Sequence, residues 1–306
     1  MDSPFHRGEQ AVQERLGLRD VEIWARRAIR DHLPEAHREF FATLPFVVAA
    51  ARDDDERPWV TLLAGGEGLA GGEGFVTSPS PSRLHLAARP PAGDALEGAL
   101  RAGADVGLLG IEPATRRRNR ANGRITGTEG GIEIVVDQSF GNCAKHIRRR
   151  WWRHAPSHRP GEARRGEVLT STARRLVEEA DTFFIGSGHR PRGGEHAAFG
   201  MDASHRGGAP GFVEVEGPAE LVFPDYWGNN LFNTLGNLEL DPRVGLTFVD
   251  FASGGLLQLS GRAGVEALAA RDSHADVGHR VRVAIERVVE LPGALPLRWD
   301  DAPPPG

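Results

Sequence analysis

Short runs of apolar residues recur along the chain, and segments rich in glycine and proline separate them. Apolar runs bounded by turn residues are typical of β-strands, whereas helices show apolar positions three or four residues apart. Helical spacing is clear only in 13–29, 95–101, 171–181 and 230–240. The strands predicted from the apolar runs are 46–51, 59–64, 83–88, 106–111, 123–125, 131–136, 183–185, 211–216, 221–224, 244–251, 256–263 and 281–289. The pattern therefore predicts a mainly β protein.

The predicted strands form two sets that follow the same order. Each set contains the string GFV, at 74–76 and 211–213, and later the string VGL, at 106–108 and 244–246. A repeat of this kind indicates two copies of one domain. The segment between the copies is highly charged and has no periodicity, which is typical of a linker. The predicted division is an N-terminal helical arm (1–35), a first barrel (36–147), a basic linker (148–170) and a second barrel (171–306).

The amino-acid composition and charge exclude several classes of protein. The 306 residues suffice for two domains, and the net charge of −5 contains no long block of one sign. Arginines at 116–118 and 120 could follow a phosphodiester backbone, but the balanced charge favours solvated turns, so no nucleic-acid partner is expected. No apolar run approaches the ~20 residues of a membrane helix, so no membrane partner is expected. A single cysteine, Cys143, excludes an intramolecular disulfide and favours a cytoplasmic protein.

Two motifs resemble known binding sites but lack the necessary context. The string GEGLAG at 66–71 has the spacing of a dinucleotide fingerprint, yet a strand follows it where that fingerprint requires a helix. His32, Glu35 and His37 lie close in sequence but do not have the spacing of a helical zinc motif. We therefore expect neither a dinucleotide fingerprint nor a metal site.

The segment 202–251 combines a predicted helix start with polar side chains. Asn229 or Asn230 is a good N-cap for this helix, and a helix start offers free N–H groups and a positive dipole end to an anion. An arginine on the preceding strand could add a bidentate contact. The simpler interpretation is a capped helix packed on a sheet, which would not require so many amides. The candidate anion-binding residues are Ser204, His205, Arg206, Asn229, Asn230, Asn233 and Thr234.

The order of SHRGG, GFV, a GNN-x-x-NTLGN helix, DPRVGL and SGRA resembles the FMN-binding split barrel of the pyridoxamine 5′-phosphate oxidase-like family. The resemblance covers 182–263, and 41–136 resembles a weaker second copy. The string DQSFGNCAKHI at 137–147 is similar to a motif of two-barrel members. The resemblance implies a mainly β fold of two tandem antiparallel split β-barrels packed as a pseudo-dimer, with FMN at their junction.

The resemblance also implies a cofactor site. The seven candidate residues would hold the phosphate and ribityl chain of FMN. Gln138, Ser139, Asn142 and Lys145 of the first copy would reach the same site, where Lys145 is the only lysine of the chain. The oxidase proper has Arg and Lys at the helix start where this chain has Asn233 and Thr234, so its vitamin substrate is not implied. No catalytic side chain is assigned.

The function implied is that of an FMN-dependent oxidoreductase. NAD(P)H or a small organic donor would pass two electrons through the flavin, which itself carries the redox chemistry, to a small-molecule substrate. An alternative is a non-catalytic flavin- or haem-binding protein, in which His189, His196 or His205 would be the axial ligand. A further alternative makes the N-terminal barrel a cofactor-free dimerisation surface. The expected assembly is a monomeric pseudo-dimer or a homodimer.

Overall fold

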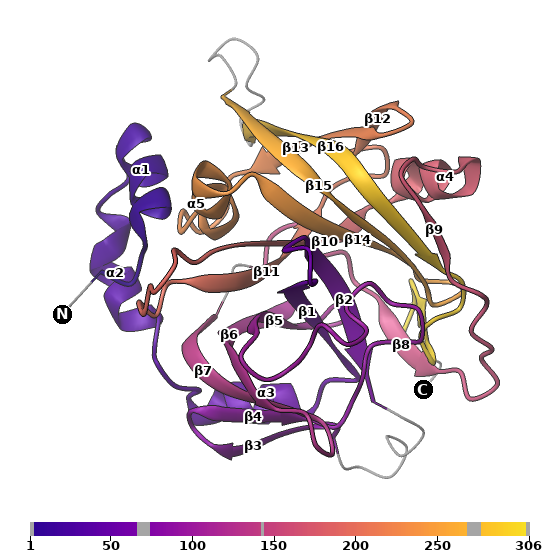
Figure 1. The fold of residues 1–306 in the computed structure, drawn as a ribbon, viewed down its shortest axis with the longest axis horizontal. Helices are drawn as coiled ribbons and strands as arrows, with labels where there is room; N and C mark the ends of the chain where they lie inside the picture. The colour runs from indigo at the N-terminus through magenta and orange to yellow at the C-terminus, as the bar shows by residue number, and fades with distance from the viewer. Residues whose placement is uncertain (1–2, 66–73, 142–143, 268–276, 304–306) are drawn as a thin grey trace.

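The computed structural model describes residues 3–65, 74–141, 144–267 and 277–303. Its two large sheets are antiparallel throughout and share one strand order, which confirms the predicted mainly β pseudo-dimer (Figure 1). In spatial order the first sheet contains β2 (Pro58–Ala64), β1 (Phe46–Arg52), β5 (Asp105–Glu112), β6 (Arg117–Gly127), β7 (Ile132–Gly141), β4 (Arg83–Leu86) and β3 (Val76–Ser80). The second contains β11 (Gly200–Gly207), β10 (Thr182–His189), β14 (Arg243–Asp250), β15 (Gly255–Ala267), β16 (Val277–Leu291), β13 (Glu220–Tyr226) and β12 (Glu214–Gly217).

The registers of the two sheets confirm the internal repeat. Arg124 opposes Asp105 at the start of β5, and Arg262 opposes Arg243 at the start of β14. Both sheets also shift register one or two residues before these arginines, between Asn122 and Gly123 and between Ser260 and Gly261. The two copies therefore correspond residue by residue across their central strands.

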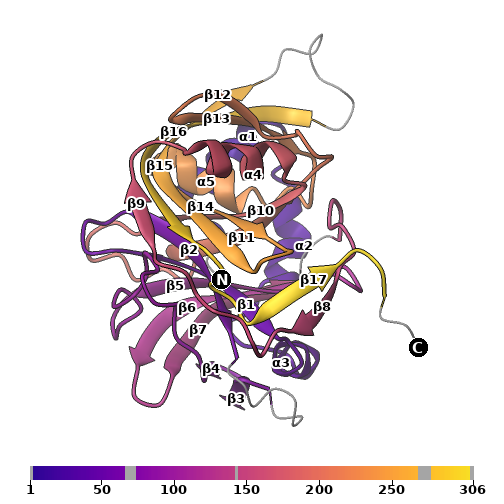
Figure 2. The same cartoon turned by 90° about the vertical axis from the view of Figure 1, so that its right-hand side faces the viewer.

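The barrels pack directly on each other, the second above the first in Figures 1 and 2. A Cβ on Gly107 of β5 would lie 2.6 Å from the Cα of Asp202, and one on Gly245 of β14 would lie 2.7 Å from the Cα of Trp59. Only glycine permits these approaches, which bring β5 against β11 and β14 against β2. One hydrophobic core accordingly contains side chains of both barrels.

Strand β1 illustrates why the sequence folds in this way. Its first six residues, FVVAAA, are all buried. A strand covered on both faces reads as a continuous apolar run, whereas a strand with one wet face alternates. The small alanines leave room for the other barrel, since a Cβ on Gly186 of β10 would lie 2.8 Å from the Cβ of Ala50.

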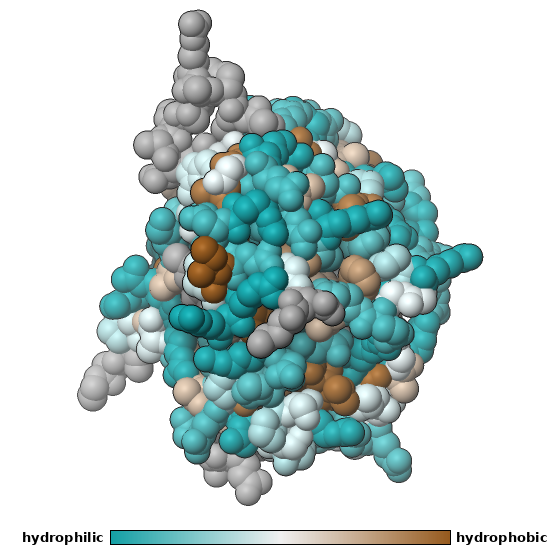
Figure 3. All heavy atoms as spheres, turned by 90° about the vertical axis from the view of Figure 1, so that its left-hand side faces the viewer, coloured by the Kyte–Doolittle hydropathy of each residue, from teal (hydrophilic) through white to brown (hydrophobic). Residues whose placement is uncertain are grey.

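The N-terminal arm contains α1 (Arg7–Arg15) and α2 (Val21–Ala28), and α3 (Glu35–Ala42) follows at the start of the first barrel. The predicted single helix over 13–29 is wrong, because Gly17 adopts a left-handed φ of +68° and ends α1. The amide of Gly17 donates to Glu14 and that of Leu18 to Gln13, as in a glycine-ended helix. Helix α3 was not predicted. Figure 3 shows the face that carries α1 and α2, which is largely hydrophilic with isolated hydrophobic residues.

The remaining helix predictions give mixed results. Helix α4 (Ser171–Glu179) is confirmed, and the side chain of Thr170 caps it by accepting from the amide of Ala173. The predicted helix over 95–101 is wrong, because this segment is a series of turns in which Gly98 has a φ of +80°. None of the helices in the described part of the chain is long and apolar enough to cross a membrane.

The predicted linker 148–170 connects the barrels and also contributes two strands. Strand β8 (Trp151–His154) pairs with β17 (Leu297–Asp300), and β9 (Arg164–Gly166) pairs with β16. Arg150 anchors the linker through an ion pair with Asp181, at 2.8 Å. The glycine-rich string at 66–71 lies outside the described residues.

Candidate functional site: a cationic cavity between the barrels

A cavity of about 90 Å³ lies between the barrels at the start of α5 (Asn233–Leu240). We call it the inter-barrel cavity. Both copies contribute to its walls, since β6 belongs to the first barrel and β11 and β13 belong to the second. The lining residues used below are Arg118, Arg120, Lys145, His146, Ser204, His205, Arg206, Asp225, Tyr226, Asn229, Asn230, Asn233 and Thr234.

Positive charge dominates this lining. Arg118, Arg120, Lys145 and Arg206 carry the cations, and Asp225 is the one carboxylate among the described lining residues. Because charges in a partly desolvated cleft are screened less than on an open surface, this excess attracts an anion.

The start of α5 differs from the prediction. The helix begins at Asn233, and Phe232 occupies the cap position with a left-handed φ of +59° and no side-chain hydrogen bond. Asn230 is also left-handed, and the side chain of Asn229 accepts from the amide of Leu231. The predicted capping of the helix by Asn229 or Asn230 is therefore wrong. The first-turn amides lack a side-chain cap, and Thr234 and Leu235 of that turn line the cavity.

Arg120 joins the two barrels. It is only 5 % exposed, and its Nε donates to the carbonyl of Ala203 on β11 at 2.9 Å. Its Nη2 donates to the hydroxyl of Ser204, and its Nη1 donates to Oδ1 of Asn233 at 3.2 Å. Asp202 neutralises it with a carboxylate oxygen 3.2 Å from Nε. Burial lowers the pKa of Arg120, which nevertheless stays protonated because arginine starts so high.

Two hydroxyl groups lie between β11 and α5. The Ser204 hydroxyl donates to Asp202 at 3.0 Å and accepts from Arg120. The Thr234 hydroxyl lies 3.3 Å from that of Ser204 and donates to it. Both residues are buried, so their polar groups are held in place by this network.

Arg206 and His205 have different environments although they are neighbours. Arg206 pairs with Asp225 at 3.2 Å, and its buried Nε has no hydrogen-bond partner among the described residues. Burial, with Arg118 close by, holds the pKa of His205 well below its usual range. Nδ1 of this neutral imidazole lies 3.3 Å from Nη1 of Arg118, which can donate to it. His205 therefore adds no charge to the cavity.

Most of the predicted residues meet at this cavity, but Gln138 and Ser139 do not. Gln138 donates to the carbonyl of Pro4 at 2.9 Å, and Ser139 donates to the carbonyl of His32 at 2.6 Å. Both contacts hold the N-terminal arm. Gln138 and Ser139 do not line the inter-barrel cavity, because β7 runs to Gly141 and directs them toward the arm. Asn142 lies outside the described residues.

The histidines considered as haem ligands are separated. His205 lines the inter-barrel cavity, whereas His189 and His196 line another cavity of about 330 Å³ together with His6 and Phe199. The rings of His189 and Phe199 pack edge to face, with centroids 6.0 Å apart.

Arg118 and Arg120 line the cavity although the balanced charge of the chain had favoured solvated turns for them. They lie two positions apart on β6, so both project from the same face of the strand toward the second barrel. The spacing of two residues within one strand was the sequence signal that could have placed both arginines on one face. His146 and Tyr226 were missed; their rings stack at 4.7 Å in the cavity wall.

The N-terminal arm covers α5 and reaches the same network. Glu9 accepts from the side-chain amide of Asn233 at 2.6 Å and from the backbone of His6 at 2.9 Å. Burial raises the pKa of Glu9 to about 8. The helices approach so closely that a Cβ on Gly8 would lie 2.1 Å from the carbonyl oxygen of Gly236. The arm therefore fixes the orientation of Asn233, whose oxygen faces Arg120.

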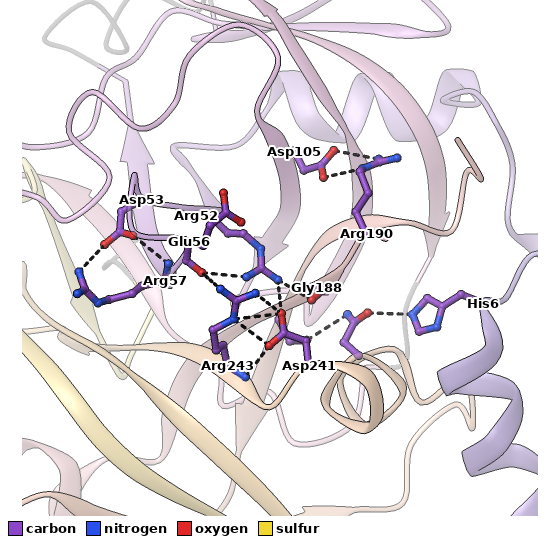
Figure 4. A network of polar contacts seen from close by, with 12 residues as sticks. His6, Arg52, Asp53, Glu56, Arg57, Asp105, Gly188, Arg190, Asp241 and Arg243 are labelled. Carbon is purple, nitrogen blue, oxygen red and sulfur yellow. Dashed lines mark hydrogen bonds and ion pairs between the residues drawn. The ribbon is translucent and has the colours of Figure 1, made fainter. Parts of the chain in front are cut away.

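A larger cleft of about 850 Å³ lies elsewhere between the barrels, and its charges are mostly paired (Figure 4). Arg52 and Arg243 both contact Asp241, at 2.9 and 2.7 Å. Burial alone would raise the pKa of Asp241, but these arginines lower it to about 2. Arg190 forms a bidentate pair with Asp105. This pairing leaves less uncompensated positive charge than in the inter-barrel cavity.

Comparisons with known proteins yield distant structural matches. No protein-family model and no curated protein sequence matches this chain. HupZ of Group A Streptococcus is 11% identical, with a TM-score of 0.30 over 39% of this chain and 91% of its own. A Lactobacillus delbrueckii protein with the provisional name pyridoxamine 5′-phosphate oxidase is 14% identical, with a TM-score of 0.31 over 40% of this chain and 94% of its own. An FAD-binding protein of Mesorhizobium loti is 13% identical, with a TM-score of 0.27 over 42% of this chain and 97% of its own.

Proposed function

We propose that the inter-barrel cavity binds the phosphate of FMN and that the protein is an FMN-dependent oxidoreductase acting on a small molecule. The observation that carries the proposal is the convergence of cations from both barrels on one cavity beside a helix start without a side-chain cap. A phosphate group combines the negative charge and the acceptor oxygens that such a lining selects. The sequence resemblance to the FMN-binding split barrels supports the same ligand.

The size of the cavity limits what it can hold. Pockets that enclose a drug-sized molecule measure roughly 300–1,000 Å³. At about 90 Å³ the inter-barrel cavity accommodates a phosphate-sized group and not a complete flavin. The proposal therefore assigns only the phosphate to it.

The side chains have distinct roles in this proposal. Arg206 supplies a guanidinium whose Nε is still available, and Arg120 supplies charge from the other barrel. Ser204 and Thr234 supply hydroxyl groups, and Lys145 adds a further cation at the wall. Bound FMN would supply the hydride-accepting chemistry, so the protein needs only to bind and orient it. NAD(P)H or a small organic donor is the proposed reductant.

A comparison of FMN with riboflavin tests the phosphate assignment. Riboflavin lacks the phosphate, so its affinity measures the remaining contacts. We expect FMN to bind at least about 30-fold more tightly, because a charged pairing of this kind contributes about 2 kcal/mol or more. Arg206→Ala should remove most of that difference. Arg117→Gln is the matched control, since Arg117 is exposed on the same strand as Arg120 and donates to the carbonyl of Ala36.

The absorption spectrum of the purified protein separates the alternatives. A flavin spectrum that NAD(P)H bleaches supports the oxidoreductase, and a flavin spectrum that no donor bleaches supports a flavin-binding protein without turnover. A Soret band would favour haem instead. Equal affinities for FMN and riboflavin would show that the phosphate assignment is wrong.

A further inference from the structure

The repeat allows the inter-barrel cavity to be compared with its counterpart in the other copy. Leu108 and Leu246 are the leucines of the two VGL strings. In the strand-pairing register, the residue two strands away from Leu108 is Thr61 in the first barrel, and the residue two strands away from Leu246 is Ser204 in the second. Thr61 and Ser204 are therefore equivalent, and both carry a hydroxyl group.

The same procedure pairs two long polar side chains. In the first barrel the residue after Leu108 pairs with Arg120 on β6. In the second barrel the residue after Leu246 pairs with Gln258 on β15. Arg120 donates from Nε to the carbonyl of Ala203 at 2.9 Å, and Gln258 donates from Nε2 to the carbonyl of Val60 at 2.8 Å. Ala203 and Val60 immediately precede the two equivalent hydroxyl residues. Each barrel thus extends one polar side chain into the other in the same way.

The inter-barrel cavity and its counterpart beside Thr61 differ in the side chains that surround them. Beside Thr61 and Gln258 lies the side chain of Asp94, which is 1 % exposed. One carboxylate oxygen accepts from the Thr61 hydroxyl and from Nε2 of Gln258 at 3.0 Å, and the other accepts from the amide of Leu96 at 2.8 Å. Asp94 lies between β4 and β5, just as α5 lies between β13 and β14.

Neutral donors, and not a cation, surround the Asp94 carboxyl. No cation among the described residues forms an ion pair with it, and burial raises the pKa of this carboxyl to about 6. A buried carboxylate that is not ion-paired is costly unless hydrogen-bond donors compensate it. Thr61, Gln258 and the Leu96 amide are those donors.

We propose that Thr61, Gln258 and the amide of Leu96 form a cradle specific for a small carboxyl group, which the side chain of Asp94 occupies. This first-barrel cradle lacks the arginine of the inter-barrel cavity, because Gln258 stands where that cavity has Arg120. A neutral set of donors suits a carboxyl group, which can be protonated, and not a phosphate. The proposal does not depend on flavin binding by the second barrel.

Chemical rescue of Asp94→Gly tests the proposal. Removing the side chain leaves three donors around a carboxylate-sized space, so the variant should melt at a lower temperature than the natural protein. At pH 5, below the raised pKa of a carboxyl in this place, sodium formate should then raise its melting temperature saturably, by roughly 2–4 °C beyond sodium chloride of equal ionic strength. If the variant does not fold in chloride, formate added during refolding should increase the yield of folded protein.

Two matched variants make the outcome decisive. Asp94→Asn loses the same charge but keeps the space filled, so formate should not stabilise it. Thr61→Val combined with Asp94→Gly leaves the space but removes one donor, so the rescue should weaken at least about fivefold in formate affinity. If formate stabilises Asp94→Gly no more than chloride does, or stabilises Asp94→Asn equally, the cradle is overturned. Unchanged FMN affinity of Asp94→Gly is expected in either case, so the test stands apart from the flavin proposal.

Discussion

The inter-barrel cavity and the first-barrel cradle occupy corresponding positions in two copies of one domain. Both have a hydroxyl residue on the sheet edge and a long polar side chain from the other barrel that donates to a backbone carbonyl. The inter-barrel cavity combines Arg120 with a helix start, whereas the first-barrel cradle combines Gln258 with the carboxyl group of Asp94. Packing between the barrels therefore fixes the shared backbone arrangement, and in the proposed function a few side chains decide whether such a site would take an external anion.

The largest expected effect comes from Arg120→Gln, which makes the second site resemble the first. Loss of the buried charge should weaken FMN binding at least about 30-fold, as judged by fluorescence titration. The substitution also leaves Asp202 without its ion-pair partner, which should destabilise the protein by about 3–5 kcal/mol.

Asp202→Asn added to Arg120→Gln separates binding from stability. The double variant no longer contains the carboxylate that Arg120 neutralises, so its melting temperature should recover while FMN affinity stays low. A double variant that folds normally and binds FMN like the natural protein would show that Arg120 only joins the barrels.

The second prediction concerns the pH dependence that Asp94 confers. Folding raises the pKa of this carboxyl from 3.8 to about 6, so the folded protein holds the proton more tightly than the unfolded chain. Its stabilising effect is therefore complete below pH ~4 and is lost as the pH rises through about 6. Relative to Asp94→Asn, the natural protein should lose about 2 kcal/mol of unfolding free energy between pH 4 and 7. A difference between the two proteins that does not change with pH would contradict this.

The third prediction concerns the N-terminal arm. Folding raises the pKa of Glu9 from 4.5 to about 8, so stability from this group decreases as the pH rises through 8. Between pH 7 and 9 the natural protein should lose about 1 kcal/mol relative to Glu9→Gln, which retains the acceptor oxygen but cannot ionise. Hydrogen exchange of the α1 amides should increase over the same interval. Glu14→Gln, an exposed change on the same helix, should retain the behaviour of the natural protein.

The smallest effect is expected at Thr234. Its hydroxyl is one donor among several, so Thr234→Val should weaken FMN binding about fivefold. Thr234→Ser keeps the hydroxyl and should restore the affinity. If the valine variant loses thermal stability and FMN affinity is unchanged, the hydroxyl serves only the contact with Ser204.

The repeat could be predicted because its signals are local. Apolar runs and the two VGL strings indicated the central strands, since burial on both faces leaves a continuous run in the sequence, but β11 (Gly200–Gly207) was not among the predicted strands. Gly17 also carried a local signal, because a glycine after an amphipathic segment commonly ends a helix. The break between α1 and α2 could have been predicted from it.

Which residues line the inter-barrel cavity depends on contacts between segments that are far apart in the sequence. Arg120 is buried only because β6 of one barrel packs against β11 of the other, more than eighty residues away along the chain. Ser139 was assigned to the flavin by resemblance, yet its hydroxyl holds the carbonyl of His32. The left-handed residues before α5, Asn230 and Phe232, also depend on context, since phenylalanine has little intrinsic preference for that conformation.

The number of FMN molecules bound per chain distinguishes the inter-barrel cavity from the first-barrel cradle most directly. Titration of the natural protein, followed by flavin fluorescence at protein concentrations well above the dissociation constant, gives this number from the break point. One FMN per chain is expected, because Asp94 occupies the first-barrel cradle and only the inter-barrel cavity is lined by arginine that could contact a phosphate. Two equivalent FMN molecules per chain, or one that persists undiminished in Arg120→Gln with Arg206→Ala, would contradict it.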